Sequence, residues 1–179
     1  MAELIVRLST DMGEIVLRLF PDQAPNTVAN FVSLMDAGYY DGLLVHRVVP
    51  NLFIQTGCPR GSGLGGPGYV IEDEFSPELS HRVPGSVSMA NMGPGTAGGQ
   101  FFITVKSMPW LDSQHSCFGV VAEGLDVVTS ISRVSRDSRK KPMTSVYVKQ
   151  LSRYPGTTDL IDAGNRYEPH LPYRRSEIF

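Results

Sequence analysis

Two long polar side chains, Arg47 and Gln55, are set in an otherwise apolar stretch of the sequence between residues 45 and 55. The apolar residues around them are interrupted by Pro50-Asn51, and this pattern predicts two short β-strands joined by a turn. An arginine or a glutamine in apolar surroundings must find a partner, because an unpaired buried charge or amide is costly. The stretch alone leaves two interpretations open: an internal ion pair with a backbone-bound amide, or a pocket with an apolar floor and a polar rim.

The rest of the sequence contains no pattern for metal or nucleophile chemistry. Asp112, Ser113 and His115 are the residue types of a hydrolase triad, but they lie close together in sequence and no nucleophile elbow is present. We attribute them to chance composition. The histidines do not follow metal-ligand spacing: His46, His81, His115 and His170. We therefore expect neither a metal nor a cofactor.

A glycine-rich segment, Gly61-Ser62-Gly63-Leu64-Gly65-Gly66, fits the dinucleotide fingerprint GxGxxG only as a pattern. That motif requires its last glycine to open a helix whose N-terminus holds the pyrophosphate. Here residues 67–71 follow, and they are typical of a turn and then a strand. We expect a tightly turning loop, and we interpret the carboxylate run Glu72-Asp73-Glu74 after it as a solvated face.

Length and charge restrict the class of protein. A chain of 179 residues allows one domain with a sizeable core, and its net charge of −2 favours neither nucleic acid nor an anionic membrane as a partner. No apolar run approaches the roughly 20 residues that span a bilayer. Met1-Ala2-Glu3-Leu4 lacks the features of a signal peptide, and Cys58 and Cys117 are too few for a disulfide framework. We expect a soluble, cytoplasmic protein with reduced thiols.

Hydrophobic periodicity predicts about eight short strands and two helices. Nine short runs fit this pattern, and they cover residues 4–8, 14–19, 45–49, 52–55, 69–71, 85–93, 100–105, 117–121 and 145–149. One helix covers residues 28–35, with Asn26 or Thr27 able to cap its start and Gly38 its end, and the other covers 125–134. The glycine-rich connections favour a closed eight-stranded antiparallel β-barrel capped by two helices, with a β-sandwich as the alternative.

The division of the chain follows from composition. We expect one domain over residues 1–152 and an irregular C-terminal extension over residues 153–179, which is rich in proline and mixed charges. In the predicted strand 100–105, alternation places Gln100 and Phe102 on one face and Phe101 and Ile103 on the other. One face of that strand therefore carries an amide beside an aromatic ring.

Four sequence blocks occur in the order and spacing typical of one family: Val45–Pro50, Ser88–Asn91, Gly98–Ile103 and Trp110–Asp112. With these blocks the chain resembles the single-domain cyclophilins, which are peptidyl-prolyl cis-trans isomerases. The resemblance covers roughly residues 4–151, and the stretches Gly65–Tyr69 and Asp73–Phe75 are more similar to bacterial members. It implies an eight-stranded barrel capped by two helices, in agreement with the periodicity.

The resemblance also implies a reaction and a set of site residues. Rotation about an X-Pro bond needs no cofactor, and Arg47 is the implied hydrogen-bond donor to the twisted imide. The implied catalytic residues are Arg47, Gln55, Phe102 and His115. The implied substrate-binding residues are Leu52, Phe53, Met89, Ala90, Asn91, Gln100, Trp110 and Leu111. The implied partners are proline-containing peptides and unfolded proteins, with cyclosporin A as an inhibitor beside Trp110, and the protein is expected to be a monomer.

One pair of residues departs from the family pattern. Where the family usually has phenylalanine and then methionine, this chain has Leu52 and Phe53. A shift of one position in a strand points a side chain to the opposite face. Either the loop absorbs the shift, or Phe53 takes the space of the methionine and Leu52 replaces the ring. Two other functions stay open: a module or chaperone that binds proline peptides with little turnover, and a structural subunit that makes contacts through its tail.

Overall fold

The structure is a computed structural model that describes residues 4–155. Within this range the chain forms eight β-strands, two α-helices and one short 3-10 helix. In chain order these are β1 (Leu4–Thr10), β2 (Gly13–Leu19), α1 (Pro25–Asp36), β3 (Arg47–Val49), β4 (Phe53–Thr56), β5 (Ser86–Met89), β6 (Phe101–Thr104), η1 (Pro109–Leu111), β7 (Cys117–Glu123), α2 (Leu125–Ser132) and β8 (Val148–Arg153).

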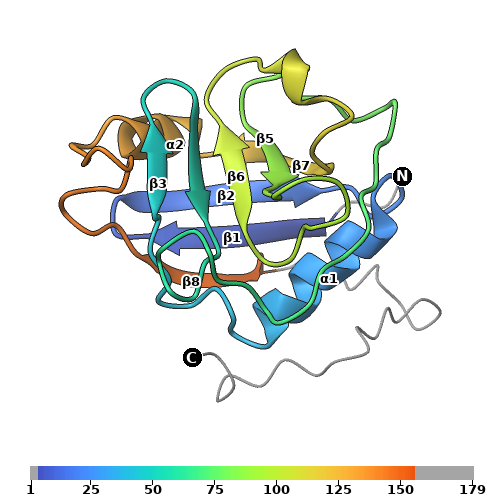
Figure 1. The fold of residues 1–179 in the computed structure, drawn as a ribbon, viewed down its shortest axis with the longest axis horizontal. Helices are drawn as coiled ribbons and strands as arrows, with labels where there is room; N and C mark the ends of the chain where they lie inside the picture. Colours follow the sequence, from blue (N-terminus) through green and yellow to red (C-terminus); the bar gives the residue numbers. More distant parts are fainter. Residues whose placement is uncertain (1–3, 156–179) are drawn as a thin grey trace.

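All eight strands belong to one antiparallel sheet with the order β3-β4-β6-β5-β7-β2-β1-β8. The sheet is strongly curled, so that β3, β4, β6 and β5 cross in front of β1 and β2 (Figure 1). The two helices lie at opposite ends of the curled sheet, α1 at the lower right of the view and α2 at the upper left behind β3 (Figure 1). The mainly β, antiparallel class with two helices is therefore confirmed.

The prediction that the barrel is closed is wrong. β3 and β8 are the first and last strands of the sheet, and no ladder pairs them within residues 4–155. The segments that precede them meet only at the isolated bridge between Leu44 and Tyr147 and at single hydrogen bonds such as Val45 N–H to the Val146 carbonyl (2.9 Å). Because β3 is only three residues long, it is too short to carry a second ladder, and the sheet stays open at this seam.

An aromatic cluster fastens α1 to the sheet. The ring centroid of Phe31 lies 5.1 Å from that of Phe101, 5.1 Å from that of Phe118 and 5.2 Å from that of Tyr40, and all four side chains are fully buried. Full burial of one phenylalanine side chain stabilises a fold by about 1.5–3 kcal/mol. The cluster therefore joins α1, β6 and β7 in one core beneath the sheet.

Several predicted elements have different limits in the structure. The predicted strand 69–71 is not a strand: only Ile71 forms an isolated bridge, with Ala97, because Pro67 and Gly68 come just before this segment and Gly98 follows Ala97. The last strand begins at Val148 instead of residue 145 and continues to Arg153, because β1 pairs with it up to that residue. It passes the predicted domain boundary by one residue. The predicted irregular extension lies, beyond residue 155, outside the described residues.

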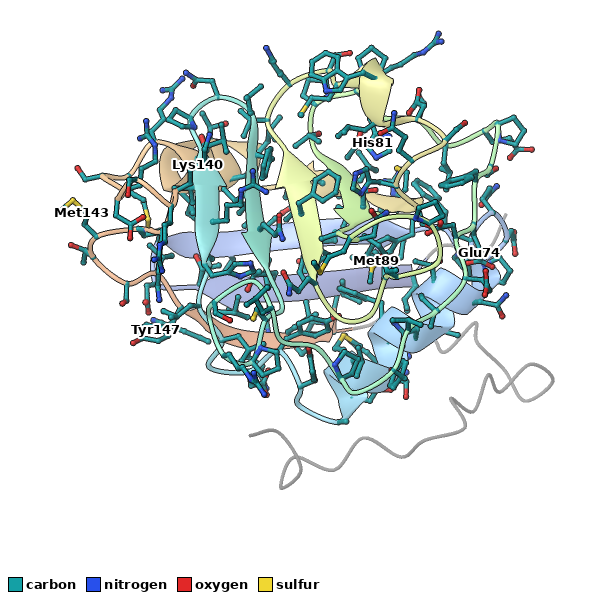
Figure 2. All side chains as sticks on the ribbon, in the orientation of Figure 1. Glu74, His81, Met89, Lys140, Met143 and Tyr147 are labelled. Atoms are coloured by element: carbon teal, nitrogen blue, oxygen red, sulfur yellow. The ribbon has the colours of Figure 1, made fainter. Side chains whose placement is uncertain are left out.

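The first turn of α1 is capped by a residue from a distant loop. Ala24 at the N-cap makes no side-chain hydrogen bond, and the Glu74 carboxylate instead accepts the backbone N–H groups of Asn26 (3.0 Å) and Thr27 (2.6 Å). It also accepts hydrogen bonds from both of their side chains, and Figure 2 shows Glu74 beside this end of the helix. The prediction that Asn26 or Thr27 caps the helix is wrong, and Glu74 is not part of a solvated face. Gly38 does end the helix, with a positive φ of 73°.

We expect Glu74→Ala to lower the free energy of unfolding by about 1–3 kcal/mol, because two backbone donors and two side-chain donors lose a charged acceptor at the positive end of a helix. Urea denaturation of the variant measures the loss. Glu72→Ala, which removes an exposed carboxylate two residues away, is the matched control. Equal stability of the two variants would contradict the role of Glu74 as the helix cap.

Candidate active site

A row of side chains crosses four neighbouring strands on one face of the sheet. Arg47 on β3 pairs with Gln55 on β4, Gln55 with Phe102 on β6, and Phe102 with Ser88 on β5. Residues that pair directly across antiparallel strands point to the same face. Their sequence neighbours point to the other face and are buried in the core: Val48, Ile54, Ile103 and Val87. The predicted alternation around Phe102 is therefore confirmed.

Phe53 joins this row from the adjacent position on the same face of β4. Its ring centroid lies 5.8 Å from that of Phe102, and the guanidinium carbon of Arg47 lies 5.2 Å from the Phe53 centroid. Arg47 is exposed and forms no ion pair within residues 4–155, so the interpretation as an internal ion pair is wrong. The arrangement is a cation resting on an aromatic floor.

The turn between β3 and β4 explains how the Leu52-Phe53 departure is accommodated. The Leu52 N–H donates to the Val49 carbonyl (3.0 Å), and Asn51 at the tip adopts a positive φ of 58°. Leu52 remains half-buried in this turn, and β4 begins only at Phe53. Phe53 therefore carries the ring to the face of Arg47 and Gln55.

A chain of amide hydrogen bonds fixes Gln55. Its Nε2 donates to Gln100 Oε1 (3.0 Å), and Gln100 Nε2 donates to the carbonyls of Gly63 (2.9 Å) and Gly65 (2.8 Å). The glycine-rich loop thus provides two carbonyl acceptors for a side-chain amide. Because both amides are held, their orientation toward the site face does not depend on a ligand.

The buried Cys58 side chain holds the same loop through hydrogen bonds to its backbone. Its Sγ accepts the backbone N–H groups of Gly63 and Gly65, each at 3.2 Å. Burial raises the pKa of the Cys58 thiol, but these backbone donors outweigh burial and lower its pKa below the ordinary value. Sequence reasoning missed this role, because the partners of Cys58 are backbone groups.

Phe102 is the centre of a cluster of rings. His115 meets it edge-on, with centroids 5.3 Å apart, and His81 stacks on it at 6.2 Å with an interplanar angle of 15°. His115 Nδ1 lies 2.9 Å from the Met89 carbonyl oxygen, which holds that ring in place. The Met89 side chain itself is fully buried in the core, so only its backbone reaches the site.

The structure contains a chain of hydrogen bonds with the connectivity of a triad, but not between the residues that the sequence grouped. Asp112 Oδ1 lies 2.7 Å from His81 Nδ1, and His81 Nε2 lies 2.9 Å from Ser88 Oγ. Ser88 is 0% exposed, so its hydroxyl cannot reach a substrate as a nucleophile. Sequence reasoning missed His81, because it is separated by 31 positions from Asp112.

The remaining predicted residues surround the row. Trp110 and Leu111 form the short helix η1, and the Trp110 side chain is 57% exposed. Asn91 Nδ2 donates to the Gln114 carbonyl (2.8 Å), which ties the end of β5 to the segment after η1. A hollow of about 220 Å³ is lined by residues that include Gln55, Ala90, Asn91 and Gln100. A larger hollow of about 500 Å³ is lined by residues that include Leu79, His81, Asp112 and His115.

His46 is a buried, neutral imidazole next to Arg47 in the sequence. It is 6% exposed, and neither ring nitrogen has a hydrogen-bond partner among residues 4–155. Burial lowers the pKa of His46 from 6.5 to about 4. The Gln100 amide and the Leu44 carbonyl lie near enough to oppose this shift, and the charges of Arg47 and Lys141 add to it. The ring therefore adds no charge to the site at neutral pH.

Residues 4–155 contain no group of three or more histidine, cysteine or carboxylate side chains that could hold a metal ion. Within the same range, no helix is both long enough and apolar enough to cross a membrane.

Comparison with known proteins gives consistent matches. A family model described as cyclophilin type peptidyl-prolyl cis-trans isomerase matches residues 5–153. The peptidyl-prolyl cis-trans isomerase cyp15 of Rhizopus delemar is 50% identical over 144 residues, which are 79% of this chain and 23% of that protein. A peptidyl-prolyl cis-trans isomerase-like 1 of Aspergillus fumigatus is 42% identical over 146 residues, 80% of this chain and 91% of that protein. The chain thus spans about a quarter of the first relative and most of the second.

Solved structures agree with the fold. The crystal structure of a cyclophilin type peptidyl-prolyl cis-trans isomerase from Cryptosporidium parvum superimposes with a TM-score of 0.83 at 32% identity, over 87% of this chain and 100% of that one. A second structure of that protein, in the presence of the dipeptide Ala-Pro, has a TM-score of 0.81 at 33% identity and covers 84% of this chain and 98% of that one.

The predicted likeness to bacterial members is not supported. The relatives from Rhizopus delemar and Aspergillus fumigatus are fungal, and a further one, from Arabidopsis thaliana, is a plant protein. The two stretches that suggested bacterial members are Gly65–Tyr69 and Asp73–Phe75. In the structure the second stretch contains Glu74, which caps α1.

We expect the free energy of unfolding to depend on the ionisation of His46. Its pKa is lower in the folded state than the ordinary value of 6.5, so the unfolded chain takes up a proton first as the pH falls. The stability due to the neutral ring is complete above pH 6.5 and is lost as the pH falls toward about 4. Between pH 7 and pH 4.5 the loss is about 1–3 kcal/mol.

Urea denaturation at both pH values measures this loss. His46→Gln removes the titrating group, and subtracting its pH dependence from that of the wild type leaves the contribution of His46 alone. An identical pH dependence of wild type and variant would show that the His46 pKa is not depressed.

Proposed function

Because the chain belongs to the family of cyclophilin-type peptidyl-prolyl cis-trans isomerases, we propose that it accelerates rotation about X-Pro peptide bonds and so assists protein folding. One observation carries the proposal. The exposed Arg47 guanidinium rests on the Phe53 ring, in the same cross-strand row as Gln55 and Phe102.

The chemistry of this reaction requires little of the protein. Rotation about an X-Pro bond has a barrier of about 18–20 kcal/mol, because amide resonance is lost when the bond is twisted. The proline nitrogen then becomes pyramidal and can accept a hydrogen bond, which the planar amide nitrogen cannot. Arg47 offers a permanently charged donor without a carboxylate partner within residues 4–155. A hydrogen bond made only at the twisted nitrogen lowers the barrier without tightening substrate binding.

In this proposal the proline ring binds on the cluster of rings around Phe102. Phe53 and His115 flank Phe102, and Leu111 is half-buried at the edge in η1. An apolar site that excludes water suits a ring without polar atoms and strengthens the hydrogen bond from Arg47. Leu52 contributes from the turn before β4.

The peptide on either side of the proline is aligned by amide groups. Gln55 Nε2 donates one of its two hydrogens to Gln100, and the other is directed to the substrate carbonyl in this proposal. Gln100 and the backbone at Ala90 and Asn91 line the 220 Å³ hollow beside it, where the residues before the proline bind. We assign Met89 only a backbone role, because its side chain is fully buried.

The substrates proposed are proline-containing peptides and unfolded proteins. The structure of the Cryptosporidium parvum relative in the presence of Ala-Pro supports this class of ligand. We further propose that the protein works as a monomer in the cytoplasm. The two buried cysteines, Cys58 and Cys117, are unpaired thiols, as is usual in a reducing compartment.

We expect Arg47→Ala to lower kcat/KM for cis-to-trans exchange of a proline tetrapeptide by about 10- to 150-fold. This range corresponds to the loss of a charge-assisted hydrogen bond of roughly 1.5–3 kcal/mol. Arg47→Lys keeps the charge but loses the planar guanidinium group, so its kcat/KM should lie between that of Arg47→Ala and that of the wild type. The exchange rate is measured by NMR in the presence of catalytic amounts of protein.

Arg139→Ala, which removes an exposed arginine outside the row, is the matched control and should leave kcat/KM unchanged. Equal rates for the wild type and Arg47→Ala would overturn the proposed role of Arg47. Tight binding of the peptide without any acceleration by the wild type would favour the alternative, a module that binds proline peptides without turnover.

We propose that cyclosporin A binds across the same row and covers Trp110. Trp110 is the single tryptophan of the chain and is exposed, so its fluorescence should shift to shorter wavelength on binding. Trp110→Ala should weaken inhibition of exchange at least about tenfold, because buried tryptophans at interfaces contribute about 2 kcal/mol or more. Inhibition without any change in fluorescence would place the inhibitor elsewhere.

A further inference from the structure

We propose that His81, held between Asp112 and Ser88, is a positioning residue that fixes the Phe102 ring on which the proline of the substrate would rest. The inference rests on the proposed isomerase function and deepens it by adding a residue that touches no substrate. The side chain of His81 is 1% exposed, so any effect of it on the reaction must pass through its neighbours.

His81 connects three separate elements of the site. Its Nδ1 lies 2.7 Å from Asp112 Oδ1, and its own backbone N–H donates to the same oxygen at 2.8 Å. Asp112 follows η1 directly, so these bonds anchor the segment that carries Trp110 and Leu111. On the other side, His81 Nε2 lies 2.9 Å from Ser88 Oγ on β5.

The ring of His81 also supports Phe102 directly. The two rings are nearly parallel, with an interplanar angle of 15° and centroids 6.2 Å apart. Ser88, the hydrogen-bond partner of His81, is also the cross-strand partner of Phe102. Phe53 and His115 are partly exposed and contact Phe102 from the site face, whereas His81 is buried. His81 is therefore the neighbour of Phe102 whose orientation is set by two hydrogen bonds and not by the ligand.

The hydrogen bonds determine the protonation state of His81. An ionised carboxylate can only accept, so Nδ1 carries the proton toward Asp112, and Nε2 accepts from the Ser88 hydroxyl. Burial lowers the pKa of His81, although the hydrogen bond and the charge of Asp112 act in the opposite direction. A neutral ring with its single proton on Nδ1 can make both hydrogen bonds: it donates to Asp112 and accepts from Ser88. Asp112 therefore fixes the position of the His81 ring and does not stabilise a positive charge on it.

This assignment leads to a contrast between two changes at one residue. Asp112→Asn retains Oδ1 as an acceptor for both the ring and the backbone N–H of His81, and its amide nitrogen can be solvated because the side chain of Asp112 is 30% exposed. Asp112→Ala removes the acceptor and releases the ring. If His81 were charged, the asparagine would lose an ion pair and behave like the alanine.

The experiment compares His81→Phe, Asp112→Asn, Asp112→Ala and the wild type. His81→Phe keeps a ring that can stack on Phe102 but loses both hydrogen bonds. For each protein, NMR exchange spectroscopy with a proline tetrapeptide gives the dissociation constant and the isomerisation rate of the bound peptide separately. Urea denaturation establishes that each variant is folded at the temperature used, and ¹⁵N shifts of the histidine rings report which nitrogen of His81 carries the proton.

We expect His81→Phe and Asp112→Ala to lower the isomerisation rate of the bound peptide by about tenfold or more, because small displacements of a positioning group cost up to about a hundredfold in rate. Their dissociation constants should change by less than about threefold, since the amide groups that align the peptide are untouched. Asp112→Asn should restore the rate to within about threefold of the wild type and keep the proton on Nδ1.

Wild-type rates in both His81→Phe and Asp112→Ala would overturn the proposal. A loss in Asp112→Asn as large as that in Asp112→Ala would also overturn it, because the charge of Asp112 would then be what matters. If His81→Phe does not fold, the comparison of the two Asp112 variants decides alone. Failure of the isomerase function itself is distinct, because the wild type would then not accelerate exchange at all.

Discussion

The site depends on the two-residue alternation of a paired sheet. Arg47, Gln55, Phe102 and Ser88 share one face because their neighbours are buried on the other. A slip of one residue in β3 or β4 would turn Arg47 or Gln55 toward the core and Val48 or Ile54 away from it, at a cost of several kcal/mol. The apolar residues that specify the register therefore also specify which functional groups face the substrate, so that core and site cannot vary independently.

The helix α1 is connected to the site through two adjacent tyrosines that follow it. The Tyr39 hydroxyl donates to the carbonyl of Gly57 at the end of β4, and the Tyr40 hydroxyl donates to the carbonyl of Gly99 before β6. Gly99 must be a glycine, because a Cβ there would lie 2.5 Å from the Tyr39 oxygen. Two of the four strands that carry the row, β4 and β6, are thus attached to the same short segment of the core, next to Gln100 and its hydrogen bond with Gln55.

Much of this arrangement could be predicted from sequence, and the exceptions share a physical cause. Alternation and turn residues placed the β1–β2 hairpin, the faces of β6 and the two helices, because these signals are local. Three features could not be found in this way: Glu74 as the cap of α1, the backbone donors to Cys58, and His81 between Asp112 and Ser88. Each is an interaction between distant segments or with backbone atoms, which composition does not record. The open seam between β3 and β8 could not be predicted either, because the curvature of the whole sheet determines whether its two outer strands pair.

The external cap on α1 has a consequence for the order of folding. Glu74 is separated from Thr27 by 47 positions, so the helix cannot be completed by residues near to it in the chain. Closing a loop of that length costs more conformational entropy than a local cap, and contacts of this kind slow folding. The hydrogen bonds between the first turn of α1 and Glu74 can therefore form only when the long segment between β4 and β5 has packed against the helix. During synthesis, residues 25–36 are made before residue 74, so these hydrogen bonds can form only after the helix residues have been made.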